Sequence, residues 1–119
     1  KGTSYLGNDP ATCANCHAMS GHYQGWQNAS HHAVATCNDC HTPGGAGKYV
    51  TKATHGYHHS MAFTLGGYPD VIRARPESRA IVEAQCRRCH ADMVQAMAWG
   101  ADLDGVSCVR CHDSVGHLR

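Results

Sequence analysis

The sequence has few of the large apolar residues from which soluble domains build their cores. Leucine, isoleucine, valine and phenylalanine together account for 15 of the 119 residues, which is below the roughly 20 % at which a chain struggles to build a core from its own side chains. Disorder does not explain this shortage, because the formal net charge is only +1 and eight residues are cysteine. A group other than the chain's own side chains must therefore supply the buried apolar mass.

Two further absences narrow the possible functions. Ten lysine and arginine residues are balanced by nine aspartate and glutamate residues, so the basic surface of a nucleic-acid-binding protein is missing. No apolar run approaches the roughly 18 residues of a membrane-spanning helix, and the sequence contains no signal peptide. An export signal or an anchor before Lys1 is compatible with both observations.

The cysteines, by contrast, follow a regular pattern. They form four Cys-x-x-Cys pairs, each followed at once by a histidine: Cys13, Cys16 and His17; Cys37, Cys40 and His41; Cys86, Cys89 and His90; and Cys108, Cys111 and His112. Disulfides and zinc sites do not require this spacing together with a following histidine. Haem c requires both, because two thioethers hold the macrocycle on one turn of chain and the next imidazole reaches the iron. We therefore predict four covalently attached haems, which also supply the missing apolar mass.

Four haems in so short a chain indicate electron transfer. A 119-residue domain has an expected radius of gyration of about 13–14 Å, so the macrocycles must lie close together. Haem c is attached outside the bacterial cytoplasm, and the motifs therefore indicate an extracytoplasmic protein. We expect one domain, residues 1–119, of the mainly α class with extensive coil, because no strand-like alternation stands out.

Helical periodicity predicts the segments between the motifs. The predicted helices cover residues 20–34, residues 48–64, a segment that starts at Pro76, and residues 91–99. Lys52, His55 and His59 share one face of the second of these helices.

The remaining iron ligands decide what each haem does, because an open or weakly held position can meet a substrate. His32 and His117 are the candidates among the histidines outside the motifs, since each lies five residues from a motif. Met19 lies within one turn of the first motif and is a further candidate, although methionine ordinarily fills gaps in a core. Ligation is not predicted for His22, His31, His55 and His58.

Several runs of the sequence are similar to one known family. Residues 4–10 (SYLGNDP), 13–19 (CANCHAM) and 37–43 (CNDCHTP) resemble the NapC/NirT family of tetrahaem quinol dehydrogenases, above all the small subunits of cytochrome c nitrite reductases. Residues 48–53 and 59–64 continue the resemblance, which extends over essentially the whole chain.

The resemblance implies a set of ligands for each iron, taken partly from its own motif and partly from elsewhere. The implied ligands are Met19 in place of His17 for the first haem, His41 with Lys52 for the second, His90 with His117 for the third, and His112 with His32 for the fourth. From the residues alone Lys52 is a solvated charge, because a lysine must lose its proton before it binds iron.

The resemblance also implies a function and a place. The chain is expected to oxidise a membrane quinol of the menaquinol type at the first haem and to relay electrons to a partner reductase. The expected partner is a pentahaem cytochrome c nitrite reductase in a hetero-oligomer on the periplasmic face of the cytoplasmic membrane, and no nitrite-reducing site is expected in this chain. Relatives carry a membrane anchor just before the segment that here starts at Lys1.

Quinol oxidation releases protons as well as electrons, so the site needs a base. His59 and Lys52 are the candidates, and His59 stands where some relatives have an acidic residue. Ligation of the first iron by His59 is the competing possibility. Two other functions stay open: a soluble tetrahaem electron shuttle and a subunit of a haem-chain filament, both without quinol chemistry. Whether the chain is an enzyme in its own right is likewise left open.

Overall fold

The chain folds into short helices joined by turns and coil, and the residues that the structure describes contain no strand. This computed structural model describes residues 2–100, 102, 103 and 105–117. The elements, in chain order, are η1 (Gly2–Leu6), α1 (Pro10–Ala14), η2 (His17–Met19), α2 (Ser20–Gln27), α3 (Cys37–His41), α4 (Gly47–Leu65), α5 (Pro76–Cys89), α6 (Ala91–Ala98) and α7 (Cys108–Cys111). The predicted α class is therefore confirmed.

Local sequence explains where two of the short helices begin. The Asp9 carboxylate accepts a hydrogen bond of 3.0 Å from the Ala11 N–H, which caps α1. At the start of α3, the Asp39 carboxylate accepts hydrogen bonds of 2.7 Å from both the Thr36 N–H and the Thr36 hydroxyl. Hydrogen bonds from Thr36 lower the pKa of Asp39, so this cap is charged at neutral pH. Caps of this kind allow helices of only five residues to form.

Most of the predicted helices are confirmed, with one clear difference. The helix predicted for residues 48–64 is α4, the helix predicted from Pro76 is α5, and the helix predicted for residues 91–99 is α6. The helix predicted for 20–34 is wrong beyond Gln27, where α2 ends. The Asn28 amide there donates a hydrogen bond of 2.9 Å to the Gln24 carbonyl. Asparagine side chains compete in this way with the helical ladder, and the chain continues in turns.

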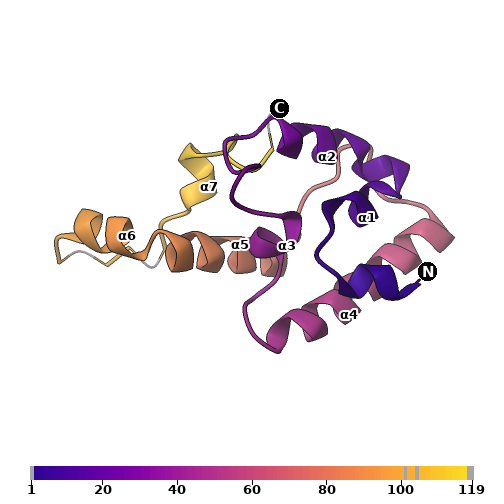
Figure 1. Cartoon of the computed structure of the whole chain (residues 1–119), viewed down its shortest axis with the longest axis horizontal. Helices are drawn as coiled ribbons and strands as arrows, with labels where there is room; N and C mark the ends of the chain where they lie inside the picture. The colour runs from indigo at the N-terminus through magenta and orange to yellow at the C-terminus, as the bar shows by residue number, and fades with distance from the viewer. Residues whose placement is uncertain (1, 101, 104, 118–119) are drawn as a thin grey trace.

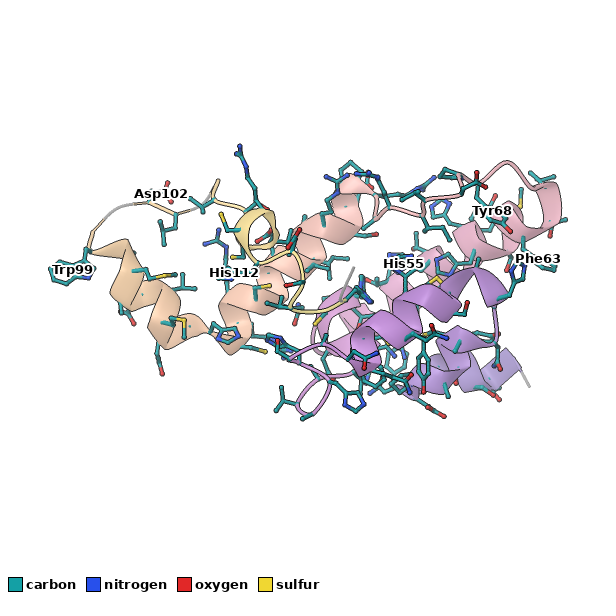
Figure 2. The ribbon with its side chains drawn as sticks, turned by 90° about the horizontal axis from the view of Figure 1, so that it is seen from above. His55, Phe63, Tyr68, Trp99, Asp102 and His112 are labelled. Carbon is teal, nitrogen blue, oxygen red and sulfur yellow. The ribbon has the colours of Figure 1, made fainter. Side chains whose placement is uncertain are left out.

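The elements are arranged around the pairing of α3 with α5 near the middle of the molecule (Figure 1). α1 lies against α2 and η2, η1 lies against α4, and α7 lies against α5. The α6 helix projects at the end of the molecule opposite to the N-terminus and α4 (Figure 1). Trp99, just after α6, is 94 % exposed at this end (Figure 2).

The interior contains little apolar mass, as the composition predicts. Ala29 is the one hydrophobic residue that is buried in the part of the chain described here, and no large side chain there is fully buried. The Cα radius of gyration is 15.1 Å, larger than the about 13.5 Å of an average domain of this length. No helix among the described residues is long and apolar enough to cross a bilayer.

Candidate haem sites

Three of the four Cys-x-x-Cys pairs lie within a single helical turn. They are Cys37 and Cys40 in α3, Cys86 and Cys89 in the last turn of α5, and Cys108 and Cys111 in α7. Residues three apart on a helix are neighbours on one face. The two thiols of each of these pairs are therefore placed to hold one group between them.

The first pair differs, because Cys16 is not part of a helix. Cys13 belongs to α1, which ends at Ala14, whereas Cys16 has extended backbone and is the N-cap of η2. The two cysteines of the first motif therefore do not share one helix, unlike those of the other three motifs. The physical reason is that a new turn starts here, since the Cys16 carbonyl accepts a hydrogen bond of 2.9 Å from the Met19 N–H.

The assignment of Cys16 as a haem-attachment residue stays a prediction. Its side chain is exposed, whereas that of Cys13 is half-buried, and both are free thiols. The Cys16 N–H still donates a hydrogen bond of 3.4 Å to the Cys13 carbonyl, which keeps the two residues in one tight turn of the backbone. Cys89 and Cys111, the second cysteines of the third and fourth motifs, are exposed in the same way.

The four motifs follow one another in space in their sequence order. The thiol of Cys13, in the first motif, lies beside that of Cys37, in the second motif, and this neighbour lowers the pKa of Cys13 to about 7. The second motif meets the third where α3 packs against α5, and the third meets the fourth where α7 packs against α5. Burial, followed by the nearby Cys108, raises the pKa of Cys86 to about 11. The attachment points thus form a continuous series from first to fourth.

The first motif continues into a tight turn in which the side chains of His17 and Met19 differ in exposure. Both residues belong to η2, but the His17 side chain is exposed whereas the Met19 side chain is half-buried. The Ser20 hydroxyl donates a hydrogen bond of 2.7 Å to the His17 carbonyl, which stabilises this turn. The arrangement fits the predicted use of Met19 in place of His17 as the first iron's ligand.

Lys52 reaches from α4 to the junction of the first two motifs. Its ammonium donates hydrogen bonds to the Leu6 carbonyl (2.9 Å), the Gly7 carbonyl and the Asn8 side-chain oxygen (3.2 Å). The Asn38 amide, inside the second motif, donates to the same Gly7 and Asn8 oxygens. Lys52 therefore lies beside the predicted second haem as a charged donor, and it must release these oxygens and a proton to bind iron.

His117 carries a mark of an iron-ligating histidine. Its Nδ1 lies 2.8 Å from the His22 carbonyl oxygen, and since a carbonyl only accepts, Nδ1 carries the proton. Nε2 is then the ring nitrogen left to face a metal, which is how metal-binding histidines are oriented. The rings nearest to His117 are those of His22 and His41, with centroids 5.4 and 6.1 Å away.

The other histidines are arranged differently from the predicted pairs. The His31 ring lies 6.0 Å from the His90 ring, and its Nδ1 lies 3.1 Å from the Val115 carbonyl oxygen. His32 is exposed and contacts the Trp26 indole edge-on, with ring centroids 4.6 Å apart. The structure thus places His31, which the sequence did not single out, beside the third motif. Nothing in the sequence predicts the contact between His31 Nδ1 and the Val115 carbonyl oxygen, because the two residues lie 84 positions apart.

His59 lies on the same side of α4 as Lys52. Partial burial, followed by the neighbouring His58, lowers the pKa of His59 below its usual value of 6.5. The ring is therefore neutral at pH 7 and able to accept a proton. The His55 ring lies 6.2 Å away, and its Nε2 is 3.3 Å from the Ser78 hydroxyl. Lys52 and His59 together give this part of α4 a charged donor and a neutral acceptor.

Comparison with known proteins yields three relatives and one solved structure. Protein NrfH of Wolinella succinogenes, a c-type cytochrome, is 39 % identical over 98 % of this chain and 73 % of its own length. The NrfH subunit of the cytochrome c nitrite reductase of Nitratidesulfovibrio vulgaris is 34 % identical over 90 % of this chain and 66 % of its own. The chain belongs to the NapC/NirT family of tetrahaem c-type cytochromes.

A more distant relative and a crystal structure agree with this assignment. The c-type cytochrome TorY of Haemophilus influenzae is 25 % identical over 92 % of this chain and 37 % of its own length. The crystal structure of a cytochrome c nitrite reductase NrfHA complex, bound to the inhibitor HQNO, contains a chain that is 32 % identical. The alignment covers 99 % of this chain and 79 % of that one with a TM-score of 0.81. No protein-family model matches the sequence.

As a NapC/NirT cytochrome the chain holds four haem c groups, and two features of the polypeptide fit them. All eight cysteines are free thiols, available for thioether bonds. The solvent-accessible surface is 8723 Å², whereas a compact chain of this mass exposes about 6,300 Å². Four haem groups packed against the chain would cover part of this additional surface.

The predicted ligand pairs stay predictions. Met19, Lys52 and His117 each lie where a motif is within reach, as described above. The pairing of His90 with His117 and of His112 with His32 is not seen in the ring contacts of the described residues, where His117 is nearest to His22 and His41.

The fourth motif is positioned by two residues that the sequence did not single out. The Glu83 carboxylate, on α5, accepts hydrogen bonds from the Ser107 hydroxyl (2.6 Å) and from the N–H groups of Cys108 (2.8 Å) and Val109 (3.3 Å), capping α7. Arg87, one turn further along α5, donates to the carbonyls of Leu103 (2.7 Å) and Val106 (2.9 Å). These partners are 16 to 26 residues away, so no local pattern predicts them.

Proposed function

We propose that this cytochrome accepts electrons from a membrane quinol beside its first motif and delivers them, beyond its fourth motif, to a partner reductase. The observation that carries the proposal is the unbroken spatial series of the four attachment motifs, from the Cys13–Cys37 contact to the packing of α5 against α7. When bound, the haem groups supply the one-electron redox chemistry that these side chains cannot. The chain's own residues hold those groups in line, as one domain of residues 1–119.

The quinol is placed beside the first motif by two side chains of α4. Lys52 lies against η1 and the second motif. As the ligand of the second iron its neutral amine would keep two N–H groups, and one of them would donate a hydrogen bond to a quinol oxygen that loses its proton. His59, which is neutral at pH 7, accepts that proton. Met19 is the ligand that we assign to the first iron.

The partner and the location follow from the relatives. The solved structure that resembles this chain is a complex of cytochrome c nitrite reductase with an inhibitor, and we assign a nitrite reductase catalytic subunit as the partner in a hetero-oligomer. The site of action is the periplasmic face of the cytoplasmic membrane, with an anchor of the kind the resemblance implies. Nitrite is reduced by the partner and not by this chain.

The test uses the tetrahaem protein, a menaquinol analogue and dithionite. We expect the analogue to reduce the protein rapidly and HQNO to slow this reaction, whereas dithionite reduction is unaffected by HQNO. Failure of every quinol to reduce the protein contradicts the proposal and favours a shuttle.

The role of His59 is tested separately with His59→Ala and the matched control His58→Ala. We expect His59→Ala to slow reduction by the quinol at least 100-fold, in line with the loss of a general base, and to leave dithionite reduction unchanged. Normal quinol reduction with an unaltered spectrum contradicts the proton-accepting role. A changed spin state of the first haem identifies His59 as an iron ligand instead.

A further inference from the structure

Two histidines one helical turn apart on α4 face each other outside the four haem motifs. His55 and His59 are separated by four positions, so both side chains lie on one face of the helix. Their ring centroids are 6.2 Å apart, and the two rings are tilted by 31°. Helices that bind zinc present a pair of histidines at this same spacing. The pair is therefore a candidate site for a metal ion other than iron.

The surroundings of His55 prepare its ring for an ion. His55 Nε2 lies 3.3 Å from the hydroxyl of Ser78, in the first turn of α5. Metal-binding histidines characteristically donate their second ring N–H to an oxygen in this way, which leaves Nδ1 of His55 to face the metal. Partial burial, followed by the neighbouring His59 and His58, lowers the pKa of His55 below 6.5. The ring is therefore neutral at pH 7, as a metal ligand must be.

His59 is available as the second ligand, whereas the adjacent His58 is not. The His59 side chain is exposed, so an ion in solution can reach it. His58 Nε2 lies 3.0 Å from the Arg75 guanidinium, and since a guanidinium only donates, the lone pair of that nitrogen is already used. A tetrahedral ion about 2.0–2.1 Å from a nitrogen of each ring holds the two ring centroids about 5 Å apart. The rings of His55 and His59 need to approach by only about 1 Å to reach this geometry.

The charges around the pair select the kind of ion. Residues 47–75 contain four lysine and arginine residues and one aspartate, so the carboxylates that Mg²⁺ and Ca²⁺ require are scarce here. Imidazole instead binds transition ions such as Zn²⁺ through its nitrogen lone pair. The described residues contain no group of three histidine, cysteine, aspartate or glutamate side chains that could hold an ion, so water completes the coordination of an ion bound by this pair.

We infer that His55 and His59 bind one Zn²⁺ ion and that this ion inhibits quinol oxidation. The bound ion occupies the lone pair with which His59 accepts the quinol proton, so the proton has no acceptor while the metal is present. The inhibitory role rests on the proposed function, because it requires His59 to be the base. Binding of the metal by the two rings does not depend on that function.

The binding test uses isothermal titration calorimetry of the chelator-treated tetrahaem protein at pH 7. Wild type should bind one Zn²⁺ ion with no change in the haem spectrum, and it should not bind Mg²⁺ at the same concentration. His55→Gln and His59→Gln should each weaken Zn²⁺ binding at least about 10-fold, because each removes one of two protein ligands. The matched control is His58→Gln, which removes a histidine from the same turn of α4 and should leave Zn²⁺ binding unchanged.

Three results overturn the metal site. Wild type that takes up no Zn²⁺, or takes it up as tightly as His55→Gln does, has no site at this pair. A His58→Gln variant that loses as much binding as His55→Gln shows that the ion is not held by the i and i+4 rings. A haem spectrum that changes on addition of Zn²⁺ shows that the ion competes for an iron ligand instead. Far-UV circular dichroism and reduction by dithionite establish that each variant is folded.

Reduction kinetics separate this inference from the proposed function. Saturating Zn²⁺ should slow reduction of wild type by the menaquinol analogue at least about 100-fold, as loss of the base does, and should leave dithionite reduction unchanged. His55→Gln, which keeps His59, should be reduced at the wild-type rate without Zn²⁺ and should resist inhibition by it. Equal inhibition of wild type and His55→Gln, or no inhibition while the metal is bound, overturns the inhibitory role. If the quinol reduces neither protein without Zn²⁺, the proposed function fails, while calorimetry still decides the metal site.

Discussion

Replacing Glu83 with alanine should destabilise the segment that carries the fourth motif. The Glu83 carboxylate accepts three hydrogen bonds, two from backbone N–H groups of α7 and one from Ser107. Loss of a helix cap costs about 0.5–2 kcal/mol, and loss of one further hydrogen bond costs about 1 kcal/mol. Since Glu83 is only partly buried, we expect a total near the middle of this range, about 2 kcal/mol at pH 7. Glu83→Gln keeps one acceptor oxygen and should cost about half as much.

The effect of Glu83 should also depend on pH in a defined direction. Partial burial acts to raise the pKa of Glu83, but hydrogen bonds from Ser107, Cys108 and Val109 outweigh it, and the pKa lies below the usual value of 4.5. A carboxylate whose pKa is lower in the folded state stabilises the fold fully above its unfolded pKa and loses this effect as pH falls through the folded pKa. The difference between wild type and Glu83→Ala should therefore be constant from pH 7 to about 5.5 and shrink below the unfolded value.

Urea unfolding of the tetrahaem protein, followed by far-UV circular dichroism at several pH values, measures this difference. The matched control is Glu77→Ala, which removes an exposed carboxylate from the first turn of the same helix. Only its interaction with the helix dipole is lost, at about 0.3–1 kcal/mol. Our reasoning is refuted if Glu83→Ala is no less stable than Glu77→Ala at pH 7. It is equally refuted if the difference from wild type does not diminish in acid.

Three other predictions concern the haem sites and their support. Cys86→Ser should weaken attachment of the third haem and lower the unfolding midpoint, because the macrocycle is part of the core; the mass of the denatured protein and its unfolding curve measure both. Met19→Ala should change the absorption spectrum of the first haem, whereas His17→Ala should not, and the opposite result would assign the ligand to His17. Trp26→Phe removes the 3.0 Å hydrogen bond from the indole N–H to the Ala35 carbonyl and should cost about 1–2 kcal/mol in thermal unfolding, with no loss contradicting that role.

The sequence by itself determined the cofactor and most of the helices. Covalent haem attachment is encoded within five consecutive residues. The four motifs, which start at Cys13, Cys37, Cys86 and Cys108, can therefore be recognised from the sequence without knowledge of the fold. Helical periodicity and Pro76 placed α4 and α5 for the same reason, because both signals are local. Where a local signal failed, at Asn28, a side chain competed with the backbone for a carbonyl.

Only the tertiary structure decided the features that join distant segments. The series of motifs depends on α3 and α7 packing against α5, and the Glu83 cap joins residues 24 to 26 positions apart. Lys52 faces η1 across more than 40 residues of chain. The orientation of α4 was also decided only by the tertiary structure. Periodicity shows that a helix has two faces, but not which of them the neighbouring segments cover. Contacts of this range are set by how the helices assemble, and no short stretch of sequence contains both partners.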